Sequence, residues 1–332
     1  MKPPFQIDPK NALVVLPADA PHHEWLEERY NGIGGSDIAA AAGVSPYATP
    51  YQLWLTKTRR VDPELLHDDT DRERFRWGHK LEPVLLDAFA EDHPWLRVTP
   101  GAGTYARPDA KHHRVNVDGL AWTPDGQLDG VIEAKTANHR QAFLWENAEV
   151  PIQYVAQCQW AMHITGAPRA YITVLIDSHD NRVRVIERDD GLINDLAAAA
   201  DEFWRLVETD TPPPVDGSST TRRMLAATHT EDDAEVELDP EWSIDLRRQA
   251  DLAERIAELT AERDKITNRL RAAMGEAEVA RLFGDIVATH KRPKTPQRRV
   301  CRDTLSVLRD INPTAYRQIV TETPASRRLH IK

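Results

Sequence analysis

Two short stretches, Asn116-Val-Asp-Gly-Leu120 and Val131-Ile-Glu-Ala-Lys135, decide how this chain folds. The second stretch is rich in β-branched residues and predicts a strand. Because successive side chains on a strand point to opposite faces, Glu133 and Lys135 point the same way. A carboxylate and an ammonium group are therefore expected on one face of this strand.

A tight reversal is predicted between the two stretches, because Pro124-Asp125-Gly126 has the residues that a turn requires. Antiparallel pairing would bring Asp118, expected at the end of the first strand, beside Glu133 and Lys135. Mg²⁺ takes oxygen ligands and is usually bound by one or two carboxylates plus a substrate phosphate, so a phosphodiester substrate is indicated. The alternative from this motif alone is a turn aspartate followed by an exposed Glu–Lys pair.

Length and composition describe an ordinary folded protein. The chain has 332 residues, of which 41% are hydrophobic, enough for one large domain and a smaller one. No run approaches the roughly 18 apolar residues of a membrane span, and the N-terminus lacks the apolar core of a signal peptide. We expect a cytosolic protein without a membrane partner, in the host cytoplasm if it is phage-encoded. Cys158 and Cys301 are too few for a disulfide framework or an iron–sulfur cluster.

The net charge of −11 is only a weak argument against a nucleic-acid partner, because the charges are unevenly distributed. Between Arg281 and Lys332 there are 12 Lys or Arg residues and 4 Asp or Glu residues. This tail includes Lys291–Lys294 and Gln297–Arg299, which could contact nucleic acid or form a solvated face. Metal-binding carboxylates would also lose negative charge once ions are bound.

A candidate anion site precedes the hairpin. A helix is predicted over 19–30, with Arg29 near its end, followed by the flexible turn Asn31-Gly-Ile-Gly-Gly35. Ser36 is the expected N-cap of the next helix, which would end at Gly43. Backbone N–H groups at such a turn, with the Arg29 guanidinium, could bind a phosphate. The alternative is a plain capped helix after a loop.

Further helices flank the hairpin in sequence. One is expected to open at Thr49-Pro50 and another to run over 71–93, where Glu82 lies beside a stripe of apolar residues. The stripe consists of Trp77, Leu81, Leu85 and Ala88. A helix starting after Pro151 would carry Tyr154 and Gln157 on one face, and Cys158, Ala161 and Met162 in the core.

The rest of the domain reads as a strand hairpin over 169–187 and a last helix that Asp190 can cap. We expect a first domain over 1–210, a Pro- and Ser-rich linker over 211–230 and a helical, basic region over 231–332. Apolar residues at heptad-like spacing between Leu252 and Ala273 indicate a long helix that needs a partner. That partner is its own domain or the second helix of a coiled coil.

Together these stretches resemble the YqaJ-type viral recombinases, in the lambda-exonuclease-like branch of the PD-(D/E)XK nucleases. The resemblance spans roughly residues 29–213 and is looser beyond. It is carried by short motifs in a specific order and spacing. These are Gly32–Ala40, Ser45-Pro-Tyr47, Thr49-Pro50 with Leu53-Trp54, Trp77-Gly78, Leu81-Glu82-Pro83, Val117-Asp118-Gly119, Ile132-Glu-Ala-Lys135 and Pro151 with Tyr154-x-x-Gln157. Val117 stands where a proline often precedes the aspartate.

The resemblance implies an α/β (α+β) fold with a restriction-endonuclease-like core: a mixed central sheet flanked by helices, with a helical C-terminal extension. It implies a site for Mg²⁺ or Mn²⁺, with two ions, held by Glu82, Asp118, Glu133 and the backbone carbonyl of Ala134. Lys135 would orient or activate the attacking water. Gln157, with Tyr154 nearby, would support the site, and Arg29 and Ser36 would receive a 5′-terminal phosphate.

The activity implied is 5′→3′ digestion of one strand of double-stranded DNA from its ends, leaving a 3′ single strand for an annealing protein. Related members form a ring-shaped trimer. Two alternatives stay open: an endonuclease or DNA-repair nuclease of the same superfamily, and a non-catalytic DNA-binding or coiled-coil scaffold with a relict nuclease fold. The endonuclease would not need a 5′-end pocket.

Overall fold

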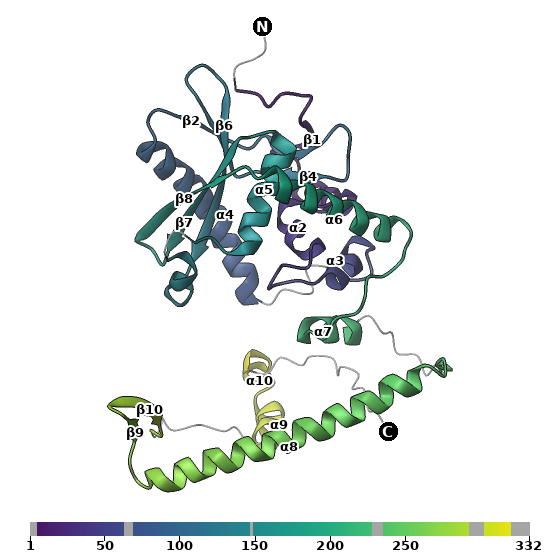
Figure 1. Ribbon diagram of the computed structural model, residues 1–332, viewed down its shortest axis with the longest axis vertical. Helices are drawn as coiled ribbons and strands as arrows, with labels where there is room; N and C mark the ends of the chain where they lie inside the picture. Colours follow the sequence, from purple (N-terminus) through teal and green to yellow (C-terminus); the bar gives the residue numbers. More distant parts are fainter. Residues whose placement is uncertain (1–4, 63–68, 147–148, 228–234, 292–301, 320–332) are drawn as a thin grey trace. The chain divides into compact units, whose positions relative to one another are not determined.

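The computed structural model describes residues 5–62, 69–146, 149–227, 235–291 and 302–319. The chain divides into two compact units, Met1–Thr230 and Glu231–Lys332. Unit 1 is a mixed α/β domain built on a central sheet with helices on both faces (Figure 1). Among the described helices, none combines the length and apolar character that a membrane crossing requires.

The central sheet of unit 1 has five strands in the order β2-β5-β6-β7-β8. β5 and β6 form the predicted antiparallel hairpin, with Gly119 opposite Ile132. β6 and β7 are parallel, whereas β2–β5 and β7–β8 are antiparallel, so the sheet is mixed as expected. The strands are β2 (Arg97–Pro100), β5 (Gly119–Trp122), β6 (Leu128–Ala137), β7 (Arg169–Ile176) and β8 (Asp180–Glu187).

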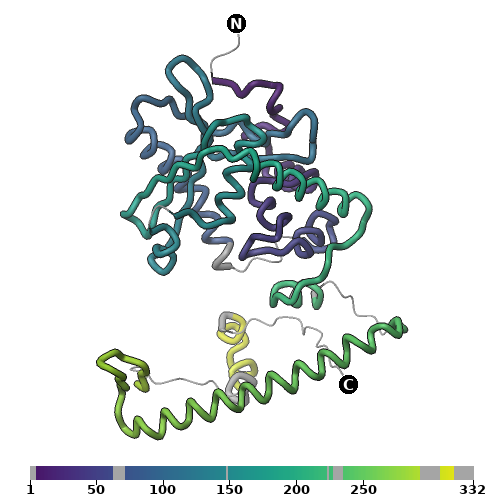
Figure 2. The backbone as a smooth tube through the Cα atoms, in the orientation of Figure 1, coloured from purple at the N-terminus to yellow at the C-terminus, as the bar shows by residue number. Residues whose placement is uncertain are grey.

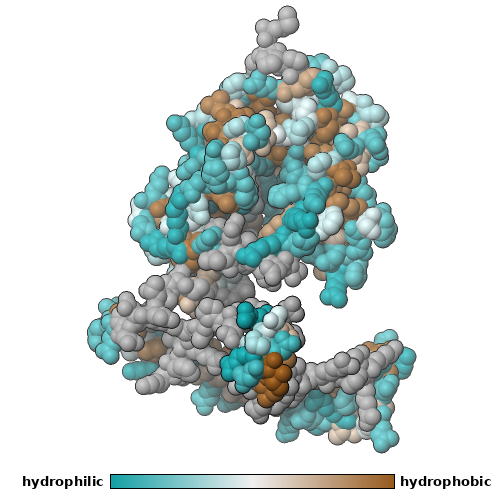
Figure 3. Space-filling view, turned by 180° about the vertical axis from the view of Figure 1, so that it is seen from behind, coloured by the Kyte–Doolittle hydropathy of each residue, from teal (hydrophilic) through white to brown (hydrophobic). Residues whose placement is uncertain are grey.

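The two faces of this sheet carry separate hydrophobic clusters, because side chains alternate along each strand. Val131 packs into the larger cluster together with α5 (Ile152–Thr165), while Ile132 packs with Leu86 and Phe89 of α4 (Asp69–Asp92). The sheet is thus the middle layer between α4 and α5. On the face of unit 1 seen in Figure 3, the remaining apolar surface forms several separate patches among hydrophilic residues.

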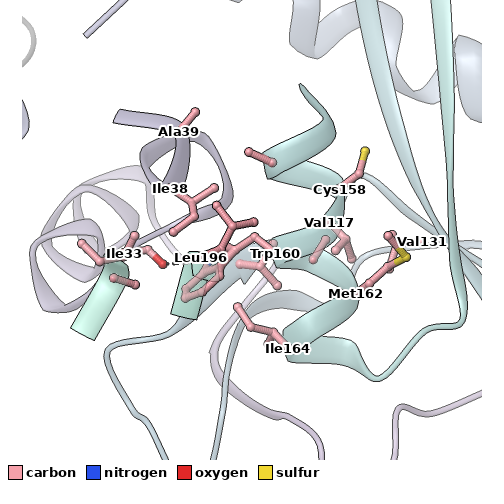
Figure 4. Close-up of a cluster of buried hydrophobic side chains, with 14 of the residues drawn as sticks. Ile33, Ile38, Ala39, Val117, Val131, Cys158, Trp160, Met162, Ile164 and Leu196 are labelled. Carbon is pink, nitrogen blue, oxygen red and sulfur yellow. Dashed lines mark hydrogen bonds between the residues drawn. The ribbon is translucent and has the colours of Figure 1, made fainter. Parts of the chain in front are cut away.

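A second, three-stranded sheet lies beside the helices that precede the hairpin. Its order is β1-β3-β4, formed by β1 (Leu13–Pro17), β3 (Gly103–Ala106) and β4 (Arg114–Asn116). The indole of Trp160 donates to the carbonyl oxygens of Ile33 and Arg114 at 3.1 and 3.0 Å, which ties α5 to both segments. Figure 4 shows Trp160 among the apolar side chains of this core.

Most of the predicted elements before and after the hairpin are present, with shifted ends. Among the described residues ahead of α4, the helices are α1 (His22–Glu28), the 3-10 turn η1 (Arg29–Asn31), α2 (Gly35–Ala41) and α3 (Pro50–Lys57). Between β6 and α5 lies the 3-10 segment η3 (His139–Trp145), and α6 (Asp190–Glu208) follows the sheet. The N-cap of α6 is Asp189, not Asp190: its carboxylate accepts from the backbone N–H of Leu192 at 3.0 Å.

The predicted buried stripe of α4 is wrong at its first position. Trp77 is 51% exposed, and the deeply buried residues of the helix are Leu85, Leu86 and Phe89. The sheet covers only the second half of α4, where these residues lie. A periodic sequence pattern cannot show which part of the helix the sheet packs against.

The segment expected to be a linker belongs to unit 1 and folds in part against α3. After the proline run it forms α7 (Ser219–Ala227), where Met224 is 1% exposed. The Gln52 side chain of α3 donates to the hydroxyls of Ser218 and Thr221, both at 2.9 Å. Figure 2 traces the chain from α6 into this helix. Hydroxyl hydrogen bonds together with Met224 and Leu225, which pack on the larger hydrophobic cluster, dock this short helix.

Unit 2 contains the long helix α8 (Trp242–Met274), which ends at Gly275 as predicted. A hairpin of β9 (Val279–Leu282) and β10 (Asp285–Thr289) follows, and then α9 (Arg302–Ile311) and α10 (Pro313–Ile319). The heptad-like apolar residues of α8 are exposed, Ile256 by 64% and Ile266 by 60%. The coiled-coil partner of α8 stays a prediction. Residues 292–294 and 297–299, which make up most of the two basic stretches, lie outside the described residues.

Candidate active site

The hairpin brings Asp118 and Glu133 together. Asp118 lies between β4 and β5, directly before Gly119, rather than at the end of a strand as expected. Since Gly119 is opposite Ile132, Asp118 reaches the next residues of β6, and its Oδ2 accepts from the backbone N–H of Ala134 at 2.8 Å. The β6 backbone therefore holds this carboxylate in place beside Glu133.

Glu133 is the most buried acid of the site, with 5% of its surface exposed. Its Oε1 accepts from the Lys135 ammonium group and from Nε2 of Gln157, the latter at 2.6 Å. Both of these hydrogen bonds end on Oε1, and Oε2 accepts neither of them. The predicted residues on β6 and α5 do meet, across the face of the sheet that α5 covers.

A third carboxylate, Glu82 of α4, lies within electrostatic reach of the same group. Burial and the nearby Glu133 carboxylate raise the pKa of Glu82. Burial raises the pKa of Asp118 to about 6, with a further rise from Glu82, and burial together with Asp118 raises that of Glu133 to about 7. Three partly or fully buried carboxylates that repel one another favour a bound cation.

The positive charge of Lys135 acts on all three carboxylates. Burial alone would lower the pKa of the Lys135 ammonium group, but Glu133 and Asp118 raise it overall. It lies 5.2 Å from the ring centroid of Tyr154, which in turn stacks on Trp145 with ring centroids 5.6 Å apart. Lys135 thus stays charged and its ammonium group is held between carboxylates and an aromatic face.

The glycine turn is organised by an ion pair that we did not predict. The carboxylate of Asp37 accepts from Nζ of Lys57 at 2.6 Å and from the backbone N–H of Gly34 at 3.1 Å, and both ionic side chains are buried. Lys57 also donates to the backbone oxygen of Arg29 at 2.6 Å. Neither charge has a local sequence signal, because 20 residues separate them.

Arg29 and Ser36 lie on either side of this turn. The Arg29 guanidinium is 3.4 Å from Asp37 Oδ1 and 5.0 Å from the ring centroid of Trp25, and nearly half of its side chain is exposed. Ser36 is exposed but is not the N-cap: α2 begins at Gly35, and the N-cap is Gly34, whose backbone N–H donates to the Asp37 carboxylate. A cap by Ser36 is excluded because the helix starts before it.

The turn also adjoins the carboxylate site. A Cβ atom placed on Gly35 would lie 3.5 Å from Cγ of Gln157, the residue that donates to Glu133. It would lie 3.3 Å from Cγ2 of Val115. The start of α2 is therefore packed directly against α5 and β4, and a larger residue at Gly35 would press on the Gln157 side chain.

Comparison with known proteins identifies the family of this chain. Residues 24–168 match the YqaJ-like viral recombinase domain. The chain is 30% identical to the "Uncharacterized protein YqaJ" of Bacillus subtilis (strain 168) over 305 residues, 90% of this chain and 91% of that protein. The chain belongs to the YqaJ-like viral recombinase family.

Two solved structures similar to this YqaJ-like chain are exonucleases by name. The alkaline exonuclease LHK-Exo of Laribacter hongkongensis is 20% identical, with a TM-score of 0.47, over 57% of this chain and 94% of its own. The phage-related exonuclease of Haemophilus somnus 129PT is 12% identical, with a TM-score of 0.38, over 54% of this chain and 96% of its own.

The YqaJ-like domain match contains every residue that we assign to the site. It begins before Arg29 and ends after Gln157, and so it also includes Asp37 and Lys57. α6, α7 and unit 2 lie beyond it. The family that the sequence motifs resemble is thus confirmed.

Proposed function

We propose that this YqaJ-like chain is a metal-dependent exonuclease that degrades one strand of double-stranded DNA from its 5′ end. One observation carries the proposal: the carboxylates of Asp118, Glu133 and Glu82, from a hairpin and a flanking helix, all interact with one half-buried lysine, Lys135. An ordinary surface ion pair consists of one acidic and one basic side chain, whose charges cancel. Three acids around one lysine leave negative charge that a divalent ion would neutralise.

The donor atoms fit Mg²⁺ or Mn²⁺. All side-chain donors are carboxylate oxygens, which hard divalent cations prefer. Glu82, Asp118 and Glu133 would hold the ions, with the backbone carbonyl of Ala134 as a further ligand. When bound, such ions would neutralise charge at the phosphate and make a water acidic enough to attack near neutral pH.

The other side chains prepare the attack. Lys135 would orient the attacking water and add positive charge where the phosphate gains negative charge. Gln157 fixes one oxygen of Glu133 and so directs the other toward the ligand position. Tyr154, next to Lys135, restricts where the ammonium group can move.

The direction of digestion would come from the glycine turn. Arg29 and Ser36 present a guanidinium and a hydroxyl group beside a turn that the Asp37–Lys57 pair makes rigid. These groups suit a terminal phosphate, for which arginine provides paired donors. Because Gly35 packs against Gln157, a 5′-phosphate bound there would place the following phosphodiester near the carboxylates.

The product would be DNA with a 3′ single-stranded end, the substrate of a strand-annealing protein in phage-type recombination. Such a protein is the partner that we propose, and a trimer encircling the duplex is the proposed assembly. Both rest on the family resemblance.

The test is digestion of linear duplex DNA labelled at either the 5′ or the 3′ end, with closed circular DNA as a control. We expect Mg²⁺-dependent early loss of the 5′ label and intact circles. Nicked circles would instead identify an endonuclease. Duplex that is retarded on a gel but never cut with Mg²⁺ or Mn²⁺ would identify a non-catalytic scaffold.

A further inference from the structure

Three metal-ligating side chains meet in unit 1 away from the proposed active site. Nε2 of His112 and Nε2 of His113 lie 2.7 and 2.9 Å from the same oxygen, Oδ1 of Asp201. The two histidines precede β4, and Asp201 is on α6. All three ligand atoms lie within 4.8 Å of one another.

Aromatic neighbours fix both imidazole rings. His112 stacks on Trp204 of α6, with ring centroids 5.8 Å apart and planes 8° apart. His113 is buried and packs on Trp160, with centroids 4.6 Å apart. The histidine side of the cluster is thus packed against aromatic rings. The Asp201 side chain is more than half exposed, so the other side of the cluster is open to solvent.

We propose that His112, His113 and Asp201 form a second metal site, which binds one divalent transition-metal ion, with Zn²⁺ as the best match. Two imidazoles and one carboxylate are ligands typical of Zn²⁺, and the open side leaves room for water as the fourth ligand. In a tetrahedral site these ligand atoms would be roughly 3.4 Å apart. The two distances from the imidazole nitrogens to Asp201 Oδ1, 2.7 and 2.9 Å, would therefore each lengthen by roughly half an ångström or slightly more. Movement of the exposed Asp201 side chain can provide this change.

The neighbour of His113 supports this assignment. Nδ1 of His113 lies 3.1 Å from Nε2 of His163 on α5, and a metal-bound histidine needs such a partner for its other ring nitrogen. Without metal, Nε2–H of His113 donates to Asp201, so Nδ1 accepts from His163. With metal on Nε2 of His113, the ring proton of His113 moves to Nδ1. This Nδ1–H then donates to Nε2 of His163, and the ring proton of His163 moves from Nε2 to Nδ1. Metal binding would thus exchange the tautomers of both histidines.

The ion would serve a structural purpose. The backbone oxygen of His112 accepts from the N–H of Ile33 at 2.7 Å, so the histidine pair is bonded directly to the glycine turn. Linking this pair to Asp201 would fasten the turn to α6. On α5, His163 is six residues from Gln157, roughly 9 Å along the helix, and the two sites share no residue. Zinc binding can therefore be measured whether or not the chain cuts DNA.

Zinc content measures the site directly. The full chain is treated with a chelator, dialysed against micromolar Zn²⁺ with excess Mg²⁺, and analysed for bound zinc by atomic absorption. We expect His112→Gln to bind one Zn²⁺ fewer per chain than the unmodified protein. The matched control is His23→Gln at an exposed histidine of unit 1, which should bind the same amount as the unmodified protein.

A second measurement is independent of the count. ¹⁵N NMR of the histidine rings should show the protonated nitrogen of His113 changing from Nε2 to Nδ1 when Zn²⁺ is added. His163→Phe should weaken Zn²⁺ binding by roughly 10- to 100-fold, because it removes the partner of Nδ1. Equal zinc content in His112→Gln and the control, or zinc binding that leaves the His113 tautomer unchanged, would overturn the proposal in favour of a purely hydrogen-bonded cluster.

Discussion

Nζ of Lys57 lies 2.6 Å from Oδ2 of Asp37, and both side chains are almost completely removed from solvent. Burial alone would raise the pKa of Asp37, but Lys57 and Arg29 hold it below its usual value. The pair bonds α3 to the start of α2, and through Arg29 and Gly34 it bonds both to the glycine turn. The proposed phosphate site thus depends on a charge pair beneath it.

Breaking this pair should destabilise unit 1. Lys57→Met leaves the Asp37 carboxylate buried without its main partner, and removal of one member of a buried pair costs about 3–5 kcal/mol. The measurement is the free energy of unfolding of unit 1 in urea. The matched control is Arg59→Met, which removes an exposed pair with Glu27 and should change little. A similar small loss in both variants would contradict the organising role of Lys57.

Removing Lys135 should impair catalysis more than DNA binding. Lys135→Met takes away the positive charge closest to the carboxylates, and loss of one such group lowers kcat by roughly 10²- to 10³-fold. Steady-state digestion of 5′-phosphorylated duplex separates kcat from KM, and gel retardation measures DNA binding. Lys135→Arg keeps the charge and should recover part of the rate. An unchanged kcat in Lys135→Met would remove the lysine from the proposed mechanism.

Removing the guanidinium of Arg29 should slow digestion mainly at DNA ends that carry a 5′-phosphate. Arg29→Ala is expected to slow digestion of 5′-phosphorylated duplex strongly and that of 5′-hydroxyl duplex little, since the latter offers no terminal charge. The ratio of the two rates is the quantity to measure. Arg60, which pairs with Asp210, provides the control Arg60→Ala. Equal slowing of both substrates by Arg29→Ala would exclude a 5′-phosphate pocket.

The metal-free protein should lose stability as the pH rises through neutrality. The folded-state pKa of Glu133 is about 7, well above its unfolded value, so the folded protein binds more protons than the unfolded one in this range. The contribution of Glu133 to the free energy of unfolding then falls as the pH rises above 4.5, the ordinary pKa of a glutamate, and levels off by about pH 8. Bound Mg²⁺ would neutralise the negative charge of the carboxylates and should make the free energy of unfolding depend less on pH.

Thermal melts at several pH values, with chelator or with Mg²⁺, measure this pH dependence. Glu133→Gln keeps the shape of the side chain, cannot ionise and should flatten the chelator curve between about pH 6.5 and 8. Below this range the buried His163, whose pKa burial lowers to about 4, acts in the opposite direction because the unfolded chain binds its proton first. A chelator curve that is the same in Glu133→Gln and the unmodified protein would contradict the raised pKa.

The hairpin and its acids could be predicted because their signals are local. Alternating β-branched residues and a Pro-Asp-Gly turn indicate a hairpin, and the pairing of Gly119 with Ile132 brings Asp118 beside Glu133. The spacing of Gln157 to Tyr154 predicts a shared helix face, whereas the place of Gln157 at the site was indicated only by the family resemblance. Glu82 was indicated only by the family resemblance, because an acid beside an apolar stripe is usually a boundary residue in a salt bridge.

What could not be predicted depends on contacts between segments far apart in sequence. Lys57 is in the last turn of its helix, where a cation is ordinary, and only the fold shows that it is buried against Asp37. The exposure of Trp77 and the docking of Met224 depend in the same way on which surfaces the tertiary structure covers. The His112–His113–Asp201 cluster joins residues almost 90 positions apart and has no sequence signature.

Only Val117 and Asp118 separate the last strand of the three-stranded sheet from β5 of the central sheet. The proposed metal ligand is therefore also the connector between two sheets. Inserting or deleting a single residue here would change the register of one sheet against the other and displace the carboxylate in the same step. Loop grafting or random insertion in this chain should tolerate changes at the 124–126 turn and none at this two-residue link.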